Sequence, residues 1–372
     1  MKAVAVFPQQ RKVETIEVDE PGIAHPLEVK LRMLQVGVCG TDREVCSFRL
    51  GSAPPGAERV ILGHESLAEV VEVGAGVKSL RPGDLAVGMV RHPCSHASCE
   101  PCRQGQQDFC TTGRYGERGI RGIDGFMTEY VVERQEYLHP VPPELREVGV
   151  LSEPLTIAEK AFAEAERIQS RLTFTPRPPR RALILGAGPV GLLGAMRFLL
   201  AGYETYVYSR LPEQSAGGRI AAAIGAPYLC SEEVGAAELR ARMGSIDVVY
   251  EALGGAQTAV DVLGQLAPNG VFLFTGVPRH GQPLPLEMAP FLERLVLENQ
   301  AVAGIVNSGF ADFRSAIANL GEFDRRWPRA LRSIITHRYP LEGYRQAVFA
   351  EGDGVKRILE LDRDLDLELD RA

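Results

Sequence analysis

The pattern of hydrophobic and polar positions divides the chain into two parts. From residue 1 to about residue 158, short apolar runs are separated by turn signals such as Pro54-Pro55-Gly56 and Pro82-Gly83. Short strands at this spacing predict a β-rich domain of the barrel or sandwich type. The clearest strands that we expect in this part are Met1–Val6, Glu28–Gln35, Leu67–Val73 and Met127–Val132.

From Arg181 onward, apolar runs typical of buried strands alternate with amphipathic stretches typical of helices. This alternation predicts an α/β fold with a doubly wound parallel sheet. The expected strands are Ala182–Leu185, Thr205–Ser209, Tyr228–Cys230, Val248–Ala252, Val271–Thr275 and Val302–Val306. The expected helices are Thr156–Ile168, Gly217–Ile224, Ala256–Leu266 and Phe310–Leu320, and the Pro- and Arg-rich residues 173–181 form a connection.

The first strand of this sheet runs into three glycines spaced GxGxxG and then into an apolar helix. Strand, glycine turn and helix in this order are the context of a dinucleotide-binding fingerprint. The glycines permit a tight turn and a close approach of the backbone to a pyrophosphate, which the helix N-terminus attracts. The sequence therefore predicts a bound nucleotide. The candidate cofactor-binding residues are Gly186, Gly188, Pro189, Val190 and Gly191, with Thr275 at a later strand end.

The residues that follow the second strand bear on the choice of coenzyme. Enzymes that use NAD commonly have a carboxylate here, which binds the ribose 2′-hydroxyl. This chain has Ser209 and Arg210, and no carboxylate before Glu213. Because Arg210 can pair with a 2′-phosphate and Ser209 can donate to it, we expect NADP to be preferred, with NAD also possible. The alternative is that Arg210 is an ordinary surface arginine.

Composition places the chain among globular proteins and narrows its partners. It has 372 residues, 45% of them hydrophobic and 24% charged, which is enough for two domains with sizeable cores. The net charge of −7 disfavours nucleic acid as a partner. No signal-peptide pattern or run of about 18 apolar residues is found, so we expect no membrane partner and a cytoplasmic location. In that compartment, cysteines act as metal ligands or free thiols.

Two groups of residues have the chemistry of metal ligands. Cys39 and His64 could hold a Zn²⁺ ion with an open position, and either Glu65 or Glu153 could supply a third ligand. The alternative for each is an ordinary core residue or solvated charge. The second group is a cysteine-rich loop whose spacing matches a closed structural zinc site, with free or redox-active thiols as the alternative. Its candidate ligands are Cys94, Cys99, Cys102 and Cys110.

The chain resembles the zinc-containing medium-chain alcohol dehydrogenases, and within them the glucose (aldose) dehydrogenase branch. The resemblance extends from Met1 to about Leu361. It rests on the motifs VCGTDREV, LGHE, GQQDFC, DGFMTEYVV, SEPLTIAEKA, GAGPVGLL and HRYPLEGYRQAV. It implies a GroES-like catalytic domain made of residues 1–158 and 308–372 and a Rossmann nucleotide-binding domain made of residues 159–307. It also implies a homodimer or homotetramer.

The resemblance assigns roles to the metal-binding candidates. Cys39, His64 and Glu153 would bind the catalytic zinc, Glu65 would be a neighbouring or alternate ligand, and Thr41 would pass on the proton. The zinc would lower the pKa of the sugar hydroxyl while hydride leaves for the nicotinamide. A second zinc would be structural, giving two per chain.

The resemblance also implies the substrate: an aldose, with D-glucose expected first, which would be oxidised to the lactone. Glu117 and Asn307 match positions that contact the sugar, although Glu117 could be a solvated charge and Asn307 a helix cap. A polyol or other secondary-alcohol dehydrogenase is the alternative enzyme. A non-catalytic nucleotide-binding protein is the alternative from another class, against which the candidate open metal site argues.

The sequence departs from the family pattern at two places. Counting back three positions from Cys99 leads to His96, whereas Cys94 lies two positions earlier. Either could be the fourth structural ligand, and we favour Cys94. The other departure is Ala68, where the GHExxG pattern has its last glycine; this methyl group affects packing and leaves the ligands unchanged.

Overall fold

The computed structural model describes residues 1–174, 178–278, 284 and 286–361. Part of the expected connection (175–177) and the end of the expected catalytic segment (362–372) therefore lie outside the described residues. Contacts divide the chain into two compact units. The first comprises Met1–Glu153, Asn307–Asp324 and Ile335–Ala372, and the second comprises Pro154–Val306 and Arg325–Ile334. No described helix has the length and apolar character needed to cross a membrane.

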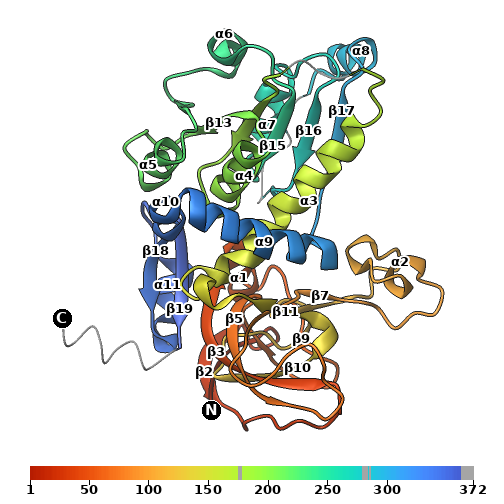
Figure 1. Cartoon of the computed structure of the whole chain (residues 1–372), viewed down its shortest axis with the longest axis vertical. Coiled ribbons are helices and arrows are strands. Elements are labelled where there is room, and N and C mark those ends of the chain that lie inside the picture. Colours follow the sequence, from red (N-terminus) through yellow and green to blue (C-terminus); the bar gives the residue numbers. More distant parts are fainter. Residues whose placement is uncertain (175–177, 279–283, 285, 362–372) are drawn as a thin grey trace. The chain divides into compact units, whose positions relative to one another are not determined.

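The first unit is built mainly of β-strands, and its helices are short except for α9 (Figure 1). Its strands are β1 (Lys2–Phe7), β2 (Lys12–Glu17), β3 (Glu28–Val38), β4 (Val60–Ile61), β5 (Glu65–Val73), β6 (Leu85–Gly88), β7 (Arg91–His92), β8 (Gly116–Arg118), β9 (Gly122–Ile123), β10 (Tyr130–Arg134), β11 (Leu138–Val141), β18 (Ile335–Tyr339) and β19 (Lys356–Glu360). Its helices are α1 (Gly40–Cys46), α2 (Glu100–Arg103), α9 (Phe310–Arg326, whose last two residues belong to the second unit) and α11 (Tyr344–Phe349), with 3₁₀ turns between the strands.

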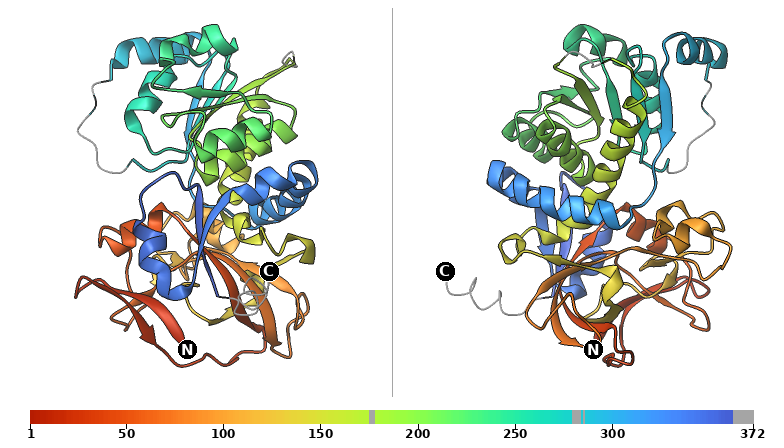
Figure 2. Two further views of the ribbon diagram at one scale, coloured as in Figure 1. Left: turned by 90° about the vertical axis from the view of Figure 1, so that its left-hand side faces the viewer. Right: turned by 45° about the vertical axis from the view of Figure 1, so that its right-hand side comes forward.

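The long strand β3 is the centre of this unit. It pairs antiparallel with β5, β10 and β19, so that both ends of the chain contribute to one sheet. Figure 2 shows the C-terminal strands in blue beside the red and orange N-terminal strands. The apolar side chains of β3 are buried, because neighbouring strands on both sides and the core below shield them from water. This pairing brings Lys356 of β19 next to the end of β3.

One expected strand is displaced. The apolar run Met127–Val132 predicts a strand from Met127, whereas β10 begins at Tyr130. The reason is a change of partner: the backbone of Met127 bonds to that of Leu62 and of Val4 instead of to β3. The segment that precedes β10 is therefore held against the chain that carries Gly63 and His64.

The second unit is a six-stranded parallel sheet with the order β14-β13-β12-β15-β16-β17, and the predicted α/β fold class is confirmed (Figure 1). Its strands are β12 (Arg181–Leu185), β13 (Glu204–Ser209), β14 (Tyr228–Cys230), β15 (Val248–Glu251), β16 (Val271–Phe274) and β17 (Ala301–Gly304). Its helices are α3 (Ser152–Gln169, which begins in the first unit), α4 (Pro189–Leu200), α5 (Ala216–Ala223), α6 (Leu239–Met243), α7 (Ala256–Leu263), α8 (Met288–Leu297) and α10 (Pro328–Ser333).

The central strands of the sheet, β12, β15 and β16, are buried on both faces. Leu183, Leu185 and Val249 pack in one cluster with side chains of α6 and α7. On the other face, Tyr250 fits against Gly194 of α4, where a β-carbon would lie 2.4 Å from its ring. Strands covered on both sides read as continuous apolar runs, and that is why the sequence predicts them well.

Candidate active site and metal centres

Three of the predicted metal ligands converge in the first unit. One ligand atom from each of Cys39, His64 and Glu65 lies within 4.8 Å of the others, and Cys39 Sγ is 3.0 Å from His64 Nε2. All three lie at the start of an element: Cys39 directly precedes α1, His64 directly precedes β5, and Glu65 is the first residue of β5. A thiol, an imidazole and a carboxylate brought together in this way are a donor set that suits Zn²⁺.

Helix α1 prepares Cys39 as a ligand. Cys39 is the N-cap residue, and its sulfur accepts a hydrogen bond of 3.2 Å from the backbone N–H of Thr41. Asp42 completes the cap by accepting a bond of 2.9 Å from the Cys39 N–H, and its other carboxylate oxygen lies 3.4 Å from His64 Nδ1. Asp42 therefore fixes both ligands, with Nε2 of His64 facing Cys39. Sequence reasoning missed this role, although Asp42 stands at the capping-box position.

Glu65 has a buried cationic partner from the other end of the chain. Lys356 of β19, only 1% exposed, forms an ion pair with Glu65 and donates a hydrogen bond of 3.0 Å to the carbonyl oxygen of Val38. Gly37 leaves the space that Glu65 occupies, since a β-carbon there would lie 1.9 Å from Glu65 Oε2. No local signal in the sequence indicates Lys356, because only the pairing of β19 with β3 brings it here.

Glu153 lies in the first turn of α3 and is buried. It stands outside the group of converging ligand atoms formed by Cys39, His64 and Glu65. Burial, and next the nearby charge of Glu65, raise the pKa of Glu153 to about 7. Two carboxylates and a thiol in a buried space repel one another when ionised, and a divalent cation relieves that repulsion. The electrostatics therefore fit a metal ion at this place.

The cysteine-rich loop forms the second cluster. The sulfur atoms of its four cysteines lie within 4.8 Å of one another, and none of the seven cysteines of the chain is in a disulfide. Four convergent thiols are the donor set of a closed structural zinc site. Backbone N–H groups, that of Cys102 foremost, hold the pKa of the Cys99 thiol well below its usual range, and this favours the metal-binding thiolate.

Of the two candidates for the fourth ligand, Cys94 and His96, only Cys94 belongs to the convergent group. Its sulfur belongs to the convergent group and accepts a hydrogen bond of 3.2 Å from the hydroxyl of Thr112. The His96 ring is exposed instead, with Nδ1 3.0 Å from the hydroxyl of Ser98. The hydroxyl of Thr111 lies 3.7 Å from Cys99 Sγ. Sequence reasoning overlooked these two threonines, which directly follow Cys110.

The two predicted sugar-contacting residues touch each other. Asn307 Nδ2 donates a hydrogen bond of 2.9 Å to Glu117 Oε1, although 190 positions separate them in the chain. Asn307 lies beyond the end of β17 at Gly304 and adopts a left-handed φ of 56°. The same Glu117 oxygen accepts hydrogen bonds from the guanidinium of Arg91, at 3.1 Å and 2.9 Å. The residue that sequence reasoning missed is Arg91, which β-pairing places directly opposite Glu117.

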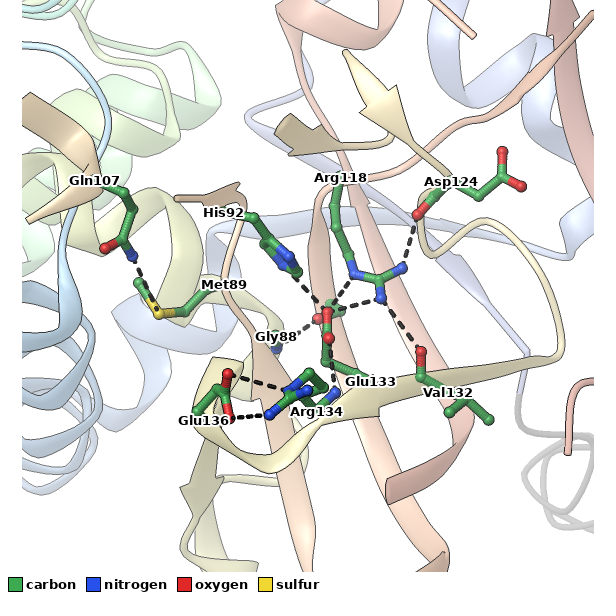
Figure 3. Close-up of polar contacts among 11 residues, drawn as sticks. Gly88, Met89, His92, Gln107, Arg118, Asp124, Val132, Glu133, Arg134 and Glu136 are labelled. Atoms are coloured by element: carbon green, nitrogen blue, oxygen red, sulfur yellow. Dashed lines mark hydrogen bonds and ion pairs between the residues drawn. The ribbon is translucent and has the colours of Figure 1, made fainter. Parts of the chain in front are cut away.

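A buried ion pair fixes Arg118, which follows Glu117 in β8 (Figure 3). The Arg118 guanidinium donates to Glu133 Oε2 at 2.7 Å and to the carbonyl oxygens of Asp124 at 2.7 Å and Val132 at 3.3 Å. His92 Nε2 lies 3.2 Å from the same Glu133 oxygen. Because these partners come from β7, from β10 and from the residue that follows β9, the strand β8 that carries Glu117 has a rigid base.

In the second unit, the predicted glycine turn joins β12 to α4. Gly186 adopts a φ of +116°, and a β-carbon on Gly191 would lie 2.1 Å from the Gly186 carbonyl oxygen, so neither accepts a side chain. Above Gly188, by contrast, nothing lies within 4 Å of the place a β-carbon would take. Pro189 and Val190 form the first turn of α4, whose N-terminal N–H groups suit a phosphate.

The other predicted cofactor residues stand at the carboxyl ends of β13 and β16, which are separated in the sheet by β12 and β15. Ser209 ends β13 and is buried, and Arg210 follows it with an exposed side chain. Thr275 follows β16 and donates a hydrogen bond of 2.7 Å to the Glu251 carbonyl oxygen. The side chain of Glu251, which sequence reasoning missed, accepts hydrogen bonds from the backbone of Leu253, Gly254 and Gly276 and so holds two loops together. This edge is where open parallel sheets bind nucleotides.

Comparison with known proteins gives a consistent result. Residues 25–143 match the family described as alcohol dehydrogenase GroES-like domain, and residues 146–361 match glucose dehydrogenase C-terminus. The glucose 1-dehydrogenases of Methanocella arvoryzae and Thermoproteus tenax are each 38% identical, over 97% of this chain and 99% of theirs.

Among solved structures, the glucose dehydrogenase of Haloferax mediterranei in complex with NADP, Zn and gluconolactone is 31% identical. It superimposes with a TM-score of 0.87 over 97% of this chain and 99% of its own. The chain therefore belongs to the zinc-containing medium-chain alcohol dehydrogenase family, in its glucose dehydrogenase branch.

Proposed function

We propose that this protein is a zinc-dependent dehydrogenase that oxidises an aldose, D-glucose first, at C1 to the lactone and transfers the hydride to NADP. The observation that carries the proposal is the hydrogen-bonded pair Glu117–Asn307, held in the unit that also presents Cys39 and His64. A metal centre alone would not distinguish a sugar from any other alcohol substrate. Carboxylate and amide groups add the acceptors and donors that a polyhydroxyl substrate requires.

The residues that would hold the catalytic metal are Cys39, His64 and Glu153, with Glu65 as an alternate ligand. Lys356 already neutralises Glu65, whereas the charge of Glu153 is opposed by Glu65, which supports Glu153 as the ligand that gains most from a cation. A zinc ion bound here would polarise the C1 hydroxyl of the sugar, and a bound NADP would accept the hydride at its nicotinamide.

The residues of the chain supply orientation and proton transfer. Glu117 and Asn307 would bind sugar hydroxyls and so fix which C–H bond is presented for transfer. Thr41, whose N–H already bonds to Cys39 Sγ, would take the proton from the C1 hydroxyl and pass it toward solvent. The C1–H bond pair would leave C1 with the hydride, and the O–H bond pair left on oxygen by the departing proton would form the carbonyl of the lactone.

The coenzyme would lie along the strand ends of the second unit. We propose that the turn Gly186–Gly191 binds the pyrophosphate and that Thr275 lies along the bound dinucleotide. Ser209 and Arg210 would bind the 2′-phosphate of NADP. Support comes from the open space above Gly188 and from the exposed Arg210 side chain directly after β13. A carboxylate at that position would repel the phosphate, and Glu213 lies further along the chain.

The cysteine cluster would bind the second, structural zinc. Cys94, Cys99, Cys102 and Cys110 supply four thiolates, and such a site has no open position for a substrate. The loop has few apolar side chains, so the metal would take the place of a hydrophobic core there.

We also propose that the protein is a homodimer at least, formed along β17. This strand pairs only with β16 among the described strands, so its other edge has unpaired backbone groups. Val302 of β17 and Met288, Leu292 and Val296 of α8 are exposed apolar residues. A second copy could pair with the strand and cover them. Replacing Val296 by Arg should then lower the mass measured by light scattering, with Arg240→Ala as a surface control.

A cytoplasmic location is proposed on the state of the cysteines. All seven are free, and four of them converge as thiols that an oxidising compartment would pair. Fractionation of the cells that produce the protein tests this directly.

The proposed activity is tested by a nicotinamide absorbance assay with both coenzymes. D-Glucose, D-galactose and D-xylose form one group of substrates, and sorbitol and 2-butanol form the other. The proposal expects reduction of NADP with at least one aldose and little or none with the second group. Inert aldoses together with a reactive polyol or simple alcohol would instead assign the chain to a different specificity within the family.

A further inference from the structure

The buried side chain of Arg91 contacts Glu117, Asp108 and Tyr115. Its side chain is 5% exposed, and strand pairing sets it directly opposite Glu117. Nε and Nη2 donate to Glu117 Oε1, while Nη1 donates over 3.1 Å to the Asp108 carbonyl oxygen. The guanidinium carbon also lies 3.7 Å from the centre of the Tyr115 ring. The planar guanidinium is therefore fixed by hydrogen bonds from its nitrogen atoms and by stacking of its face on the Tyr115 ring.

These contacts determine how the Glu117 carboxylate is presented. Arg91 and Asn307 both donate to Oε1, and among the described residues no donor bonds to Oε2. The Glu117 side chain is 14% exposed, so it is not sealed from ligands. A carboxylate held by one oxygen keeps the acceptor positions of the other oxygen for a ligand hydroxyl. Without these donors the side chain would lose rotamer freedom on binding, which weakens affinity.

The third nitrogen of the Arg91 guanidinium, Nη1, is hydrogen-bonded to the cysteine-rich loop. Asp108, whose carbonyl oxygen accepts from Nη1, lies two residues before Cys110. The position of Glu117 is thus fixed relative to the cysteine cluster, through Arg91, and relative to Asn307, through a direct hydrogen bond. A lysine could supply the charge, but it could not bond to Glu117 and Asp108 in this fixed geometry.

We propose that Arg91 is a positioning residue for sugar recognition: by holding Oε1 of Glu117, it directs Oε2 to one hydroxyl of the bound aldose. The inference rests on the proposed function, since it requires a sugar substrate bound by Glu117. It predicts that Arg91 determines how strongly the protein discriminates between D-glucose and the analogue that lacks that one hydroxyl.

The test compares D-glucose with its 2-, 3-, 4- and 6-deoxy analogues in wild type, Glu117→Gln, Arg91→Met, Arg91→Lys and the double variant Arg91→Met/Glu117→Gln. The control is Arg121→Met, because the exposed side chain of Arg121 also lies over Tyr115, at 5.2 Å. Arg121 bonds to Glu117 through the backbone, which the substitution keeps, and among the described residues its side chain forms no hydrogen bond or ion pair with Glu117. Values of kcat and KM are measured separately, and zinc content and thermal unfolding are recorded for every variant.

Wild type should lose about tenfold or more in kcat/KM with one deoxy analogue, the value of one good hydrogen bond to a charged group. Arg91→Met should raise KM for D-glucose by about tenfold, with kcat changed much less. Like Glu117→Gln, it should also abolish the difference in kcat/KM between D-glucose and that same deoxy analogue. The double variant should be no worse than the poorer single variant, because both remove one interaction. Arg91→Lys should fall between wild type and Arg91→Met, and Arg121→Met should match wild type.

The role of Arg91 would be overturned if Arg91→Met still discriminates between D-glucose and the deoxy analogue, or if the losses in kcat/KM of the two single variants add in the double variant. The proposed function would then remain in place. If Arg91→Met does not fold, full discrimination by the folded Arg91→Lys protein would overturn it equally. A wild-type protein that oxidises no aldose would overturn the proposed function, and the inference with it.

Discussion

The backbone of Gly119 lies so close to that of Gly63 that a β-carbon on Gly119 would be 2.3 Å from the Gly63 carbonyl oxygen. Gly119 follows the sugar-contacting candidate Glu117 and the buried Arg118, and Gly63 precedes the metal-ligand candidate His64. The two proposed parts of the active site are therefore in direct backbone contact within one unit.

We expect Gly119→Ala to damage both parts. The new methyl group must displace backbone atoms, and the left-handed φ of +68° adds strain. We predict a loss of unfolding free energy of about 1–3 kcal/mol and a fall in kcat/KM for D-glucose. Gly122→Ala is the matched control, because its φ is +69° but nothing lies within 4 Å of its β-carbon position. Equal losses for both variants, in urea unfolding and in kinetics, would argue against the contact.

The two clusters should each bind one zinc ion, as measured by metal analysis of freshly purified protein. Cys39→Ser should lose one of the two ions and all activity but keep its stability. Cys102→Ser should lose the other ion and unfold more easily, because the metal organises that loop. Wild-type protein with only one ion per chain would contradict this assignment.

The same analysis separates the two glutamates. Glu153→Gln should lose the ion that Cys39→Ser loses, since its carboxylate is proposed as a ligand. Glu65→Gln should retain it, because Lys356 is the partner of Glu65. The reverse result would make Glu65 the ligand and Glu153 its neighbour.

Coenzyme preference should depend on Arg210. Arg210→Ala removes a cation from the proposed 2′-phosphate site, and a charge-assisted hydrogen bond contributes about 1.5–3 kcal/mol. We therefore expect KM for NADP to rise by about tenfold or more, with KM for NAD nearly unchanged. Arg219→Ala, an exposed arginine on α5, serves as the control. If Arg210→Ala raises both constants equally, the 2′-phosphate is bound elsewhere.

The buried pair Arg118–Glu133 should make stability depend on pH. Burial alone would raise the pKa of Glu133, but the charge of Arg118 and the His92 ring lower it to about 2, against an ordinary value of 4.5. A carboxyl group whose pKa is lowered on folding stabilises the folded state above its ordinary pKa. This contribution, about 3 kcal/mol, should be lost as the pH falls from about 4.5 toward 2.

Glu133→Gln has no such group, so the difference in urea midpoint between wild type and variant should be largest near pH 7 and shrink below pH 4.5. A difference that stays constant over this range would contradict the role of the pair.

How much the sequence predicts depends on where a residue finds its partners. The parallel strands were predicted to within a few residues because burial on both faces leaves apolar runs, as at Leu183–Leu185. The start of β10 was not, because Met127 pairs with Leu62, far away in the chain. No pattern within a window of residues can indicate such a choice of partner.

The same reasoning applies to the candidate site. The four loop cysteines stand in a spacing that indicates a zinc site, whereas the ligand roles of Cys39 and His64 are implied by the resemblance to the family. Both groups converge in the structure. Arg91 and Lys356 carry no such signal. Arg91 acquires its role through the pairing of β7 with β8, and Lys356 through the pairing of β19 with β3. Residues that support a site from another strand become visible only once the register of the sheet is known.

The most direct test of the account follows the hydrogen atom on C1 of the sugar. D-Glucose labelled with deuterium at C1 is incubated with the protein and NADP, and the NADPH formed is analysed by mass spectrometry. Oxidation at C1 with direct hydride transfer predicts that each NADPH carries one deuterium. NADPH that is formed without deuterium would show that another carbon is oxidised, and would contradict the proposed function.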